Sequence, residues 1–486
     1  MSLAHRIAQN TAIQIAGKVL STALGVGIVA ILTRELGREG FGAYSTANAF
    51  LQVFTLVLDL GLNVTLVALL GEHAGDEKFE RRCTSALFTL RIFMAGVTLL
   101  LLAPLIGFAT SYSWEIKLAI VALTGSFFFP SLNQVVMGAQ QRHLRMASAA
   151  IAENIGRVVA LGGLILGIWL SWGLLPSMWI ITLASIATFL YNFFSVRRYV
   201  DFSWNWDVAF WKSALARSWP VGLSVAFGLI YFKADTLILS WVRPQAEVGI
   251  YGAAYRVLEI LIAVPFIYAG LILPILSKAW ATKDKAAFGT IMARSVDLMS
   301  LLVAPLIAGT WLVGPNLMQA ISGDEFRVSG NVLGVLIIAI GAIFFNTVFS
   351  HAVVAQDLQK RMIPIYILTA VFTLTGYLLF IPTYGIWAAA WLTVFSETCV
   401  GLGSLIVTSN ALRIPFKISL SLKAMIGAVA MYIVVLPLKD LWLPIPILVG
   451  ALVYSALLFL TGALNKKMIQ ELIRLREKNV DTSILP

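Results

Sequence analysis

The sequence predicts an all-α, polytopic integral membrane protein with about 14 transmembrane helices, arranged as two halves of six helices and two further C-terminal helices. Three observations lead to this class: an apolar composition, long apolar runs from end to end, and a repeated motif. Of the 486 residues, 59% are hydrophobic and only 12% are charged, and the mean hydropathy is +0.88. Soluble proteins carry about 25% charged residues, so we expect a membrane protein.

The predicted helices are apolar runs of roughly 20 residues, the length that crosses the bilayer core. Backbone groups in lipid need internal hydrogen bonds, so such runs are helical. Alternating segments of about ten residues, typical of a membrane β-barrel, do not occur. Because 362–381 and 419–437 are the weakest runs, about 12 helices remain an alternative. The expected spans are 11–33, 41–70, 83–109, 115–138, 147–170, 174–196, 218–242, 249–276, 291–313, 329–354, 362–381, 384–408, 419–437 and 442–463.

The net charge of +11 is explained by topology and not by nucleic-acid binding. If the N-terminus is cytoplasmic, 23 loop lysines and arginines lie on the cytoplasmic side. The other side holds five: Arg34, Arg38, Arg243, Arg327 and Lys439. Cytoplasmic loops are the basic ones in membrane proteins, so the asymmetry predicts a multi-pass protein of the cytoplasmic (inner) membrane with both termini in the cytoplasm and an even number of helices.

Two weak repeats occur in the same order along the chain. Residues 41–48 read FGAYSTAN and residues 248–255 read VGIYGAAY. Residues 138–146 (GAQQRHLRM) are echoed at 354–362 (VAQDLQKRM). The matching residues are 207 positions apart in the first pair and 216 in the second. Two ordered repeats at nearly one spacing predict a duplicated half, and duplicated membrane proteins are typically transporters with a site between the halves.

We therefore expect an N-terminal lobe (1–198), a connecting segment (199–217), a C-terminal lobe (218–412), two additional helices (413–463) and a basic amphipathic tail (464–486). The connecting segment holds Trp204, Trp206 and Trp211 among basic residues. Tryptophan rings favour the headgroup level of a membrane, so we expect this segment to lie at the cytoplasmic interface.

Charged and polar residues inside the spans are the candidates for a transport path, because a charge at mid-membrane costs about 2.5–3.5 kcal/mol. In the second span they follow one helical face, four, three and four residues apart. We predict a cavity lined by Lys18, Asn48, Gln52, Asp59, Arg157, Lys233, Asp235, Tyr255 and Arg256. Acidic residues in such a path also carry protons or bind sodium, and the candidates for coupling to H+ or Na+ are Asp59, Asp235, Glu259 and Glu397.

Several polar residues have a structural alternative. The spacings Glu153–Arg157 and Arg256–Glu259 also suit ion pairs along one helix. Arg91 lies near the cytoplasmic end of its span, so we expect its side chain to snorkel to the surface. Tyrosines at helical spacing are more often packing residues than ligands. Cys83 and Cys399 fall in helices, where we expect small buried side chains.

Motifs for catalysis and metal binding are missing from the sequence. The four histidines have no metal-ligand spacing. Neither a GxxxxGK[ST] phosphate loop nor a GxSxG nucleophile elbow occurs. We therefore expect no metal, no cofactor and no enzymatic activity.

Residues 32–62 (LTRELGREGFGAYSTANAFLQVFTLVLDLGL) resemble the opening of the polysaccharide transporter family, which comprises O-antigen and oligosaccharide flippases. The superfamily also contains MATE multidrug exporters and lipid II flippases. In the first half the resemblance lies in Arg34, Leu36, Gly37, Gly40, Phe41, Gly42, Tyr44, Gly61 and Leu62. In the second half it lies in Asp235, Gly249, Tyr251, Ala254, Tyr255 and Arg256. These motifs are informative about the family and uninformative about the substrate.

The resemblance implies two six-helix lobes around a central cavity that opens alternately to each side. It implies a substrate that is an oligosaccharide on polyprenyl pyrophosphate, moved from the inner to the outer leaflet for lipopolysaccharide or another surface polysaccharide. The pyrophosphate needs a cation, and the candidates are Lys18, Arg157, Lys233 and Arg256. Expected partners are the lipid-linked oligosaccharide, membrane lipids, a polysaccharide polymerase and glycosyltransferases, and no nucleic acid.

Two other functions stay open at this point. A cation-coupled, MATE-like multidrug exporter has the same fold, and drug resistance in a sensitive host distinguishes it. A membrane glycosyltransferase or polymerase is the enzymatic alternative, although such enzymes often carry a sizeable extramembrane loop that the sequence lacks.

Overall fold

The computed structural model describes residues 3–59, 61–73, 75–143, 145–411 and 418–463, and these ranges contain helices and no β-strand. Eleven helical stretches within them are long and apolar enough to cross a membrane. Each of the 14 predicted spans falls largely on helix. The predicted all-α, polytopic membrane class is therefore confirmed. The predicted tail 464–486 lies outside the described residues.

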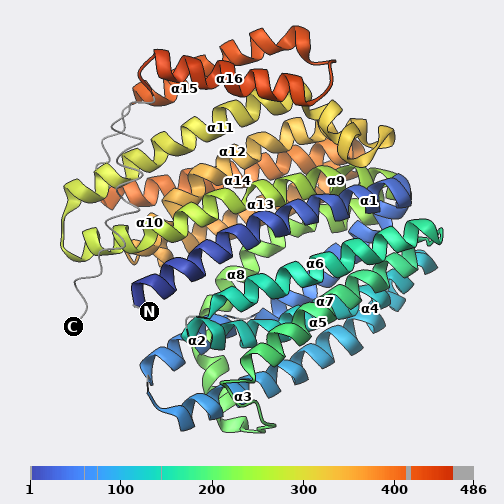
Figure 1. Cartoon of the computed structure of the whole chain (residues 1–486), viewed down its shortest axis with the longest axis vertical. Helices are drawn as coiled ribbons and strands as arrows, with labels where there is room; N and C mark the ends of the chain where they lie inside the picture. The colour runs from blue at the N-terminus through green and yellow to red at the C-terminus, as the bar shows by residue number, and fades with distance from the viewer. Residues whose placement is uncertain (1–2, 60, 74, 144, 412–417, 464–486) are drawn as a thin grey trace. The chain divides into compact units, whose positions relative to one another are not determined.

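The chain divides into two compact units, Met1–Gly249 and Ile250–Pro486, and α9 (Gln245–Leu261) runs through the boundary. The helices of the first unit are coloured blue to green in Figure 1. They are α1 (Leu3–Asp59), α2 (Leu62–Glu72), α3 (Glu77–Ala95), α4 (Ala103–Ala109), α5 (Trp114–Arg142), α6 (Met146–Trp169), α7 (Leu174–Val196) and α8 (Val208–Val242). A π-helical turn, Gly96–Leu102, joins α3 to α4, so the predicted span 83–109 is one continuous stretch.

The second unit continues with seven further α-helices in its described part. They are α10 (Ala263–Ala281), α11 (Lys285–Ser322), α12 (Arg327–Ala355), α13 (Gln359–Tyr384), α14 (Ile386–Ala411), α15 (Ile418–Val435) and α16 (Pro444–Leu460). The hairpin α15–α16 packs on α11 through an apolar cluster that includes Met431 and Leu458. Within this cluster the Tyr454 hydroxyl donates to the Leu301 carbonyl oxygen at 2.9 Å.

Glycines break the long helical runs where the chain must turn. Gly37 interrupts α1 with φ 61° and ψ −173°, which separates the first predicted span from the second. Gly61 adopts the left-handed conformation, φ 72°, just before α2. Residues with a Cβ rarely adopt such angles. The sequence motif at 37 and 61 therefore marks two bends.

The first repeat corresponds to a contact between two glycines within the first unit. A Cβ atom on Gly42 of α1 would lie 1.9 Å from the carbonyl oxygen of Gln245, and a Cβ on Gly249 would lie 2.0 Å from that of Arg38. Thr46 Oγ1 also donates to Gln245 Oε1 at 2.8 Å. Each copy of the motif thus supplies the glycine that lets α1 and the start of α9 approach backbone to backbone.

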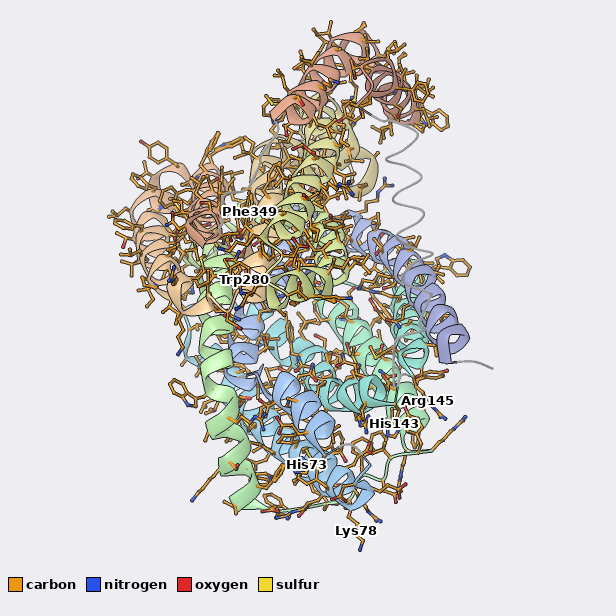
Figure 2. All side chains as sticks on the ribbon, turned by 90° about the vertical axis from the view of Figure 1, so that its left-hand side faces the viewer. His73, Lys78, His143, Arg145, Trp280 and Phe349 are labelled. Atoms are coloured by element: carbon orange, nitrogen blue, oxygen red, sulfur yellow. The ribbon has the colours of Figure 1, made fainter. Side chains whose placement is uncertain are left out.

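The loops predicted to be cytoplasmic gather at one end of the first unit. Figure 2 shows His73, Lys78, His143 and Arg145 towards that end. His143 Nε2 lies 2.6 Å from Glu80 Oε1, which joins the end of α5 to the start of α3. The guanidinium of Arg145 lies 4.5 Å from the ring centre of Tyr199. The turn after α5 therefore contacts both the start of α3 and the segment after α7.

The connecting segment is bound to α3 along its length. Ser85 Oγ donates to the Asp201 carbonyl oxygen at 3.4 Å, and Arg82 Nε donates to Asp207 Oδ2 at 2.8 Å. Trp204 is exposed, as an interfacial ring would be. Trp211 is buried in an apolar cluster, and its Nε1 donates to the Ala86 carbonyl oxygen at 2.9 Å. The interfacial position of the segment stays a prediction.

Asp207 makes the attachment of this segment pH-dependent. The backbone N–H of Phe210 and the Arg82 guanidinium hold the pKa of its carboxyl group below the ordinary value. A depressed carboxyl pKa adds stability above the unfolded value, about 3.9, and this contribution is lost as the pH falls through the folded pKa. We expect Asp207→Asn to lower the Tm slightly at neutral pH and to have less effect as the pH approaches about 3.

Thermal unfolding of the purified protein across this pH range measures the effect. Asp440→Asn is the control, since Asp440 is exposed in a loop of the second unit. A difference between wild type and Asp207→Asn that stays constant with pH would contradict the assignment.

Candidate functional site

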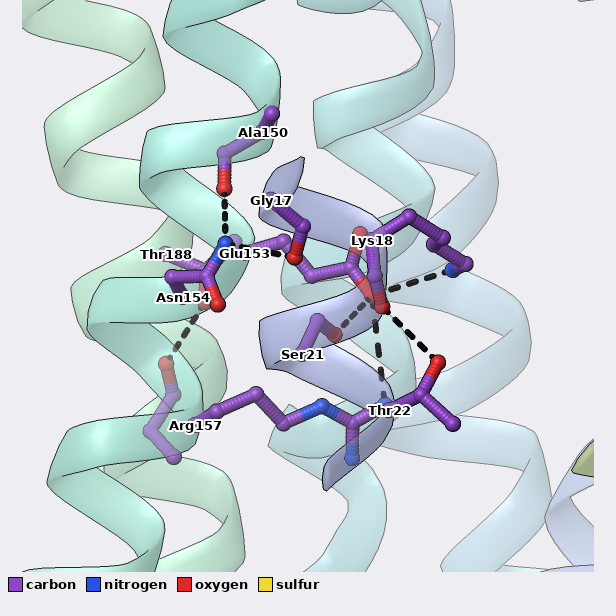
Figure 3. Close-up of polar contacts among 10 residues, drawn as sticks. Gly17, Lys18, Ser21, Thr22, Ala150, Glu153, Asn154, Arg157 and Thr188 are labelled. Atoms are coloured by element: carbon purple, nitrogen blue, oxygen red, sulfur yellow. Dashed lines mark hydrogen bonds and ion pairs between the residues drawn. The ribbon is translucent and has the colours of Figure 1, made fainter. Parts of the chain in front are cut away.

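A polar cluster joins α1 to α6 in the first unit (Figure 3). Glu153 Oε1 of α6 lies 3.2 Å from Lys18 Nζ of α1 and accepts a hydrogen bond from Ser21 Oγ at 2.6 Å. Arg157 Nη2, one turn further along α6, lies 4.0 Å from the same oxygen. We call Lys18, Ser21, Glu153 and Arg157 the α1–α6 cluster. Two cations share one carboxylate, so the formal charge of the cluster is +1.

The close approach of the two helices depends on small residues. A Cβ on Gly17 would lie 3.0 Å from the Ala150 Cβ, so α1 and α6 are nearly in backbone contact there. Asn154 Nδ2 donates to the carbonyl oxygens of Gly17 at 3.0 Å and Ala150 at 2.8 Å. These bonds fix α6 against α1, and Glu153 and Arg157 then project from the turns beside the contact.

The charged members of the cluster are partly exposed although they belong to helices that can span a membrane. The side chains of Lys18, Glu153 and Arg157 are 51%, 37% and 43% exposed. Glu153 and Arg157 lie roughly 10 and 16 Å along α6 from its first residue. Charged groups at such depth face a protein interior or water, not lipid. The cluster is therefore a candidate polar surface within membrane-length helices.

The second half of α1 carries the predicted stripe. Asn48 and Gln52 are half-buried. The backbone carbonyl oxygen of Gln52 accepts a hydrogen bond from Thr55 Oγ1 at 2.7 Å. The side chain of Asp59, the end of the stripe, lies outside the described residues. The kink at Gly37 lies between the stripe and Lys18, and no recorded contact joins the two groups.

Lys233 and Asp235 lie on α8. Asp235 is fully buried, and its Oδ1 accepts hydrogen bonds from the Thr236 backbone N–H at 2.5 Å and the Thr236 hydroxyl at 3.1 Å. Lys233 is half-buried. Whether these two side chains line a substrate path stays a prediction.

The predicted residues of α9 make contacts within the helix. Arg256 Nη1 lies 2.7 Å from Glu259 Oε2, which is the structural ion pair that the spacing allows. Tyr255 is 3% exposed and its ring centre lies 5.6 Å from that of Tyr251, so the two rings pack together. A role of Tyr255 in a substrate path stays a prediction. Glu397 on α14 is 4% exposed.

One expectation about a single residue is wrong. Arg91 does not snorkel: it is 1% exposed, and its guanidinium donates to the Leu58 carbonyl oxygen and to Gln134 Oε1. It thereby binds a carbonyl at the C-terminal end of α1, where the helix has no further N–H to offer. Lys18, for which the local sequence offers no partner, pairs with Glu153 from another helix.

Sequence reasoning missed Ser21 and treated Glu153 only as the local partner of Arg157. Ser21 lies three residues after Lys18 on the same helical face, which is the signal that would have indicated it. The pairing of Lys18 with Glu153 spans 135 positions, and no local pattern reports such a contact.

Helices of membrane length, with partly exposed charges inside them, define a polytopic membrane protein. The sequence model of the family described as polysaccharide biosynthesis protein matches residues 7–280. The chain belongs to this family. The model of the MatE family matches residues 220–382.

Two curated relatives come from the archaeon Haloferax volcanii. The probable flippase AglR is 21% identical over 96% of this chain and 98% of its own length. The probable low-salt glycan biosynthesis flippase Agl15 is 26% identical over 51% of this chain and 54% of its own length.

Solved structures share the fold. The lipid II flippase MurJ in an inward closed conformation aligns with a TM-score of 0.74 at 15% identity, over 93% of this chain and 98% of MurJ. An inward-facing MATE-family multidrug transporter of the MOP superfamily aligns with a TM-score of 0.68 at 14% identity, over 82% of this chain and 97% of its own. The resemblance to the flippase and exporter superfamily is thereby confirmed at the level of the fold.

Proposed function

We propose that this chain is a flippase that moves a polyprenyl-pyrophosphate-linked oligosaccharide from the inner to the outer leaflet of the cytoplasmic membrane. The α1–α6 cluster is the observation that carries the proposal. It combines two cations with one carboxylate and is partly exposed in helices of membrane length. A site for an anionic, hydrated head group needs these two properties.

The polar head group is the reason that translocation across the bilayer requires a protein. An oligosaccharide carries many hydroxyl groups, and their transfer into hydrocarbon without hydrogen bonds costs several kcal/mol for each group. A water-accessible path inside the protein removes this cost. The pyrophosphate needs charged donors, and Arg157 offers a planar guanidinium suited to phosphate oxygens. Lys18 adds a second positive charge close by.

Glu153 has a positioning role in this proposal. It holds the Lys18 ammonium at 3.2 Å and lies 4.0 Å from the Arg157 guanidinium, so the two cations stay near each other without a ligand. Ser21 fixes the carboxylate from the α1 side. A pyrophosphate with several oxygens is able to replace the carboxylate as the shared acceptor.

Alternating access is the mechanism that the duplicated architecture favours. In this mechanism the lipid tail stays in the bilayer while the head group crosses. The proposal also implies that the enzymes that build the oligosaccharide act before the flippase and that a polymerase acts after it. The two relatives named as flippases support transport and not catalysis. The positive-inside asymmetry of the loops supports cytoplasmic termini.

A MATE-like multidrug exporter is the second candidate, because the MatE model covers part of both units. Expression of the chain in two bacterial hosts separates the candidates: one lacks its own oligosaccharide flippase and the other is drug-sensitive. We expect surface glycan to return in the first host without drug resistance in the second. Resistance without glycan would favour the exporter. Sugar transfer from a nucleotide donor by the purified chain would favour the glycosyltransferase.

A further inference from the structure

Glu397 is a carboxyl group buried inside a membrane-length helix. It lies near the middle of α14, Ile386–Ala411, and is 4% exposed. No hydrogen bond or ion pair to its side chain is recorded among the described residues. The other described acidic candidates differ from it: Glu259 pairs with Arg256 at 2.7 Å, and Asp235 accepts hydrogen bonds from Thr236.

The polar groups recorded near Glu397 on the described helices are neutral. On α13, Tyr366 lies within electrostatic range. One turn before Glu397, the Thr393 hydroxyl contacts the hydroxyls of Tyr251 at 3.4 Å and Tyr377 at 3.3 Å. Two turns after it, Ser404 Oγ donates to Asn346 Oδ1 of α12 at 3.0 Å.

The charged and titratable groups of the neighbouring helices lie elsewhere along those helices than Glu397. On α12, His351 lies beyond Phe349, whose carbonyl oxygen faces Thr408, 11 residues after Glu397 on α14. On α9, Arg256 is occupied by Glu259. Lys360 and Arg361 belong to the first turn of α13. No recorded contact brings any of these cations to Glu397.

An ionised carboxylate in such surroundings costs several kcal/mol unless a cation accompanies it. A proton removes the charge altogether. Sodium requires several further oxygen ligands, which transporters often obtain from unwound helices. Here α12 and α14 are continuous helices, so their backbone oxygens are occupied in the helix. In the described part of the chain, no three His, Cys, Asp or Glu side chains lie together as metal ligands would.

We infer that Glu397 is a proton-binding site of the second unit, which carries a proton at neutral pH and releases it when the surrounding helices rearrange. Combined with the proposed flippase function, on which this second step rests, protonation and release at Glu397 couple translocation to the proton gradient. The chemistry requires only that the site exchanges H+ with water in one conformation and is closed to it in the other.

Carbodiimide labelling tests the proton site directly. N,N′-dicyclohexylcarbodiimide partitions into membranes and reacts with protonated carboxyl groups. The carboxyl proton moves to a nitrogen of the reagent, the carboxyl oxygen adds to the central carbon, and rearrangement leaves a stable N-acylurea. We treat the full-length purified protein in liposomes and locate the adduct by peptide mass spectrometry. We expect Glu397 to be modified at neutral pH, and modification to fall as the pH rises.

Glu153 and Glu259 are internal controls, since both pair with arginine or lysine in membrane helices, and we expect little modification of either. Glu397→Gln, nearly isosteric, should lose the adduct. The inference is overturned if Glu397 stays unmodified, if its modification is independent of pH, or if sodium at constant pH protects it, which would indicate a sodium site.

A transport measurement tests the coupling. In proteoliposomes with an imposed pH gradient, wild-type translocation of lipid-linked oligosaccharide should respond to the gradient, and Glu397→Gln should lose the response. Gradient-dependent transport in Glu397→Gln would overturn the coupling. A labelled Glu397 in a chain that moves no oligosaccharide would contradict the proposed function and leave the proton site intact.

Discussion

Arg157→Ala is expected to lower the rate of oligosaccharide translocation by about 10- to 100-fold, because a hydrogen bond to a charged group contributes about 1.5–3 kcal/mol. The Arg157 side chain is 43% exposed, so it is accessible to a ligand. Lys18→Ala should have a smaller effect, since an ammonium lacks the paired donors of a guanidinium. The measurement is translocation per folded protein, with folding checked by size-exclusion chromatography in detergent.

Two further variants separate charge from structure. Arg198→Ala removes an exposed arginine outside the spans and should leave translocation near the wild-type rate. Glu153→Gln keeps both cations and removes the carboxylate between them, so oligosaccharide binding should be retained or strengthened. If Glu153→Gln and Arg157→Ala lost activity equally and both lost folded protein, the cluster would be a structural ion pair.

Gly42→Ala is expected to destabilise the protein by about 1–3 kcal/mol, as overpacking of a tight contact usually does. The new methyl carbon would lie 1.9 Å from the Gln245 carbonyl oxygen, which is backbone and unable to rotate away. The start of α9 must then move away from α1. A lower midpoint of thermal unfolding and reduced translocation are the expected measurements.

Gly162→Ala provides the matched control for this prediction. Gly162 lies in α6 with no atom within 4 Å of the added Cβ, so the substitution should be neutral or stabilise the helix by up to about 1 kcal/mol. An unchanged unfolding midpoint in Gly42→Ala would show that the close approach is not required.

The helices could be predicted from the sequence because lipid imposes a simple rule. A run of roughly 20 apolar residues is long enough to span, and runs such as 147–170 and 174–196 agree with α6 and α7 within one residue at each end. The repeat also predicted that Gly42 and Gly249 are related. It did not predict that they are in contact, which depends on how α1 packs against residues 245–249.

The candidate site was predictable only in part. Lys18 and Arg157 stood out because charge is rare in membrane spans. Their common partner Glu153 joins them through tertiary packing of α1 on α6, which hydropathy does not encode. Arg91 was misjudged for the same reason, since its position suggested a route to the surface and the fold supplied Leu58 and Gln134 inside.

The two copies of the second repeat have different hydrogen bonds. Gln140 Nε2 donates to Asn192 Oδ1 at 2.8 Å. Its counterpart Gln356 is also buried, but its side chain has no hydrogen-bond partner among the described residues. The residue 216 positions after Asn192 is Thr408, whose hydroxyl contacts the Phe349 carbonyl oxygen at 3.5 Å instead.

Translocation by the purified chain tests the flippase proposal most directly. Fluorescent lipid-linked oligosaccharide is reconstituted with the protein in liposomes, and a membrane-impermeant quencher reports the fraction in the outer leaflet over time. We predict that wild-type protein makes nearly all of the substrate accessible, whereas Arg157→Ala and protein-free liposomes leave the inner-leaflet fraction protected. Protection that is equal with and without the wild-type chain would contradict the proposed function.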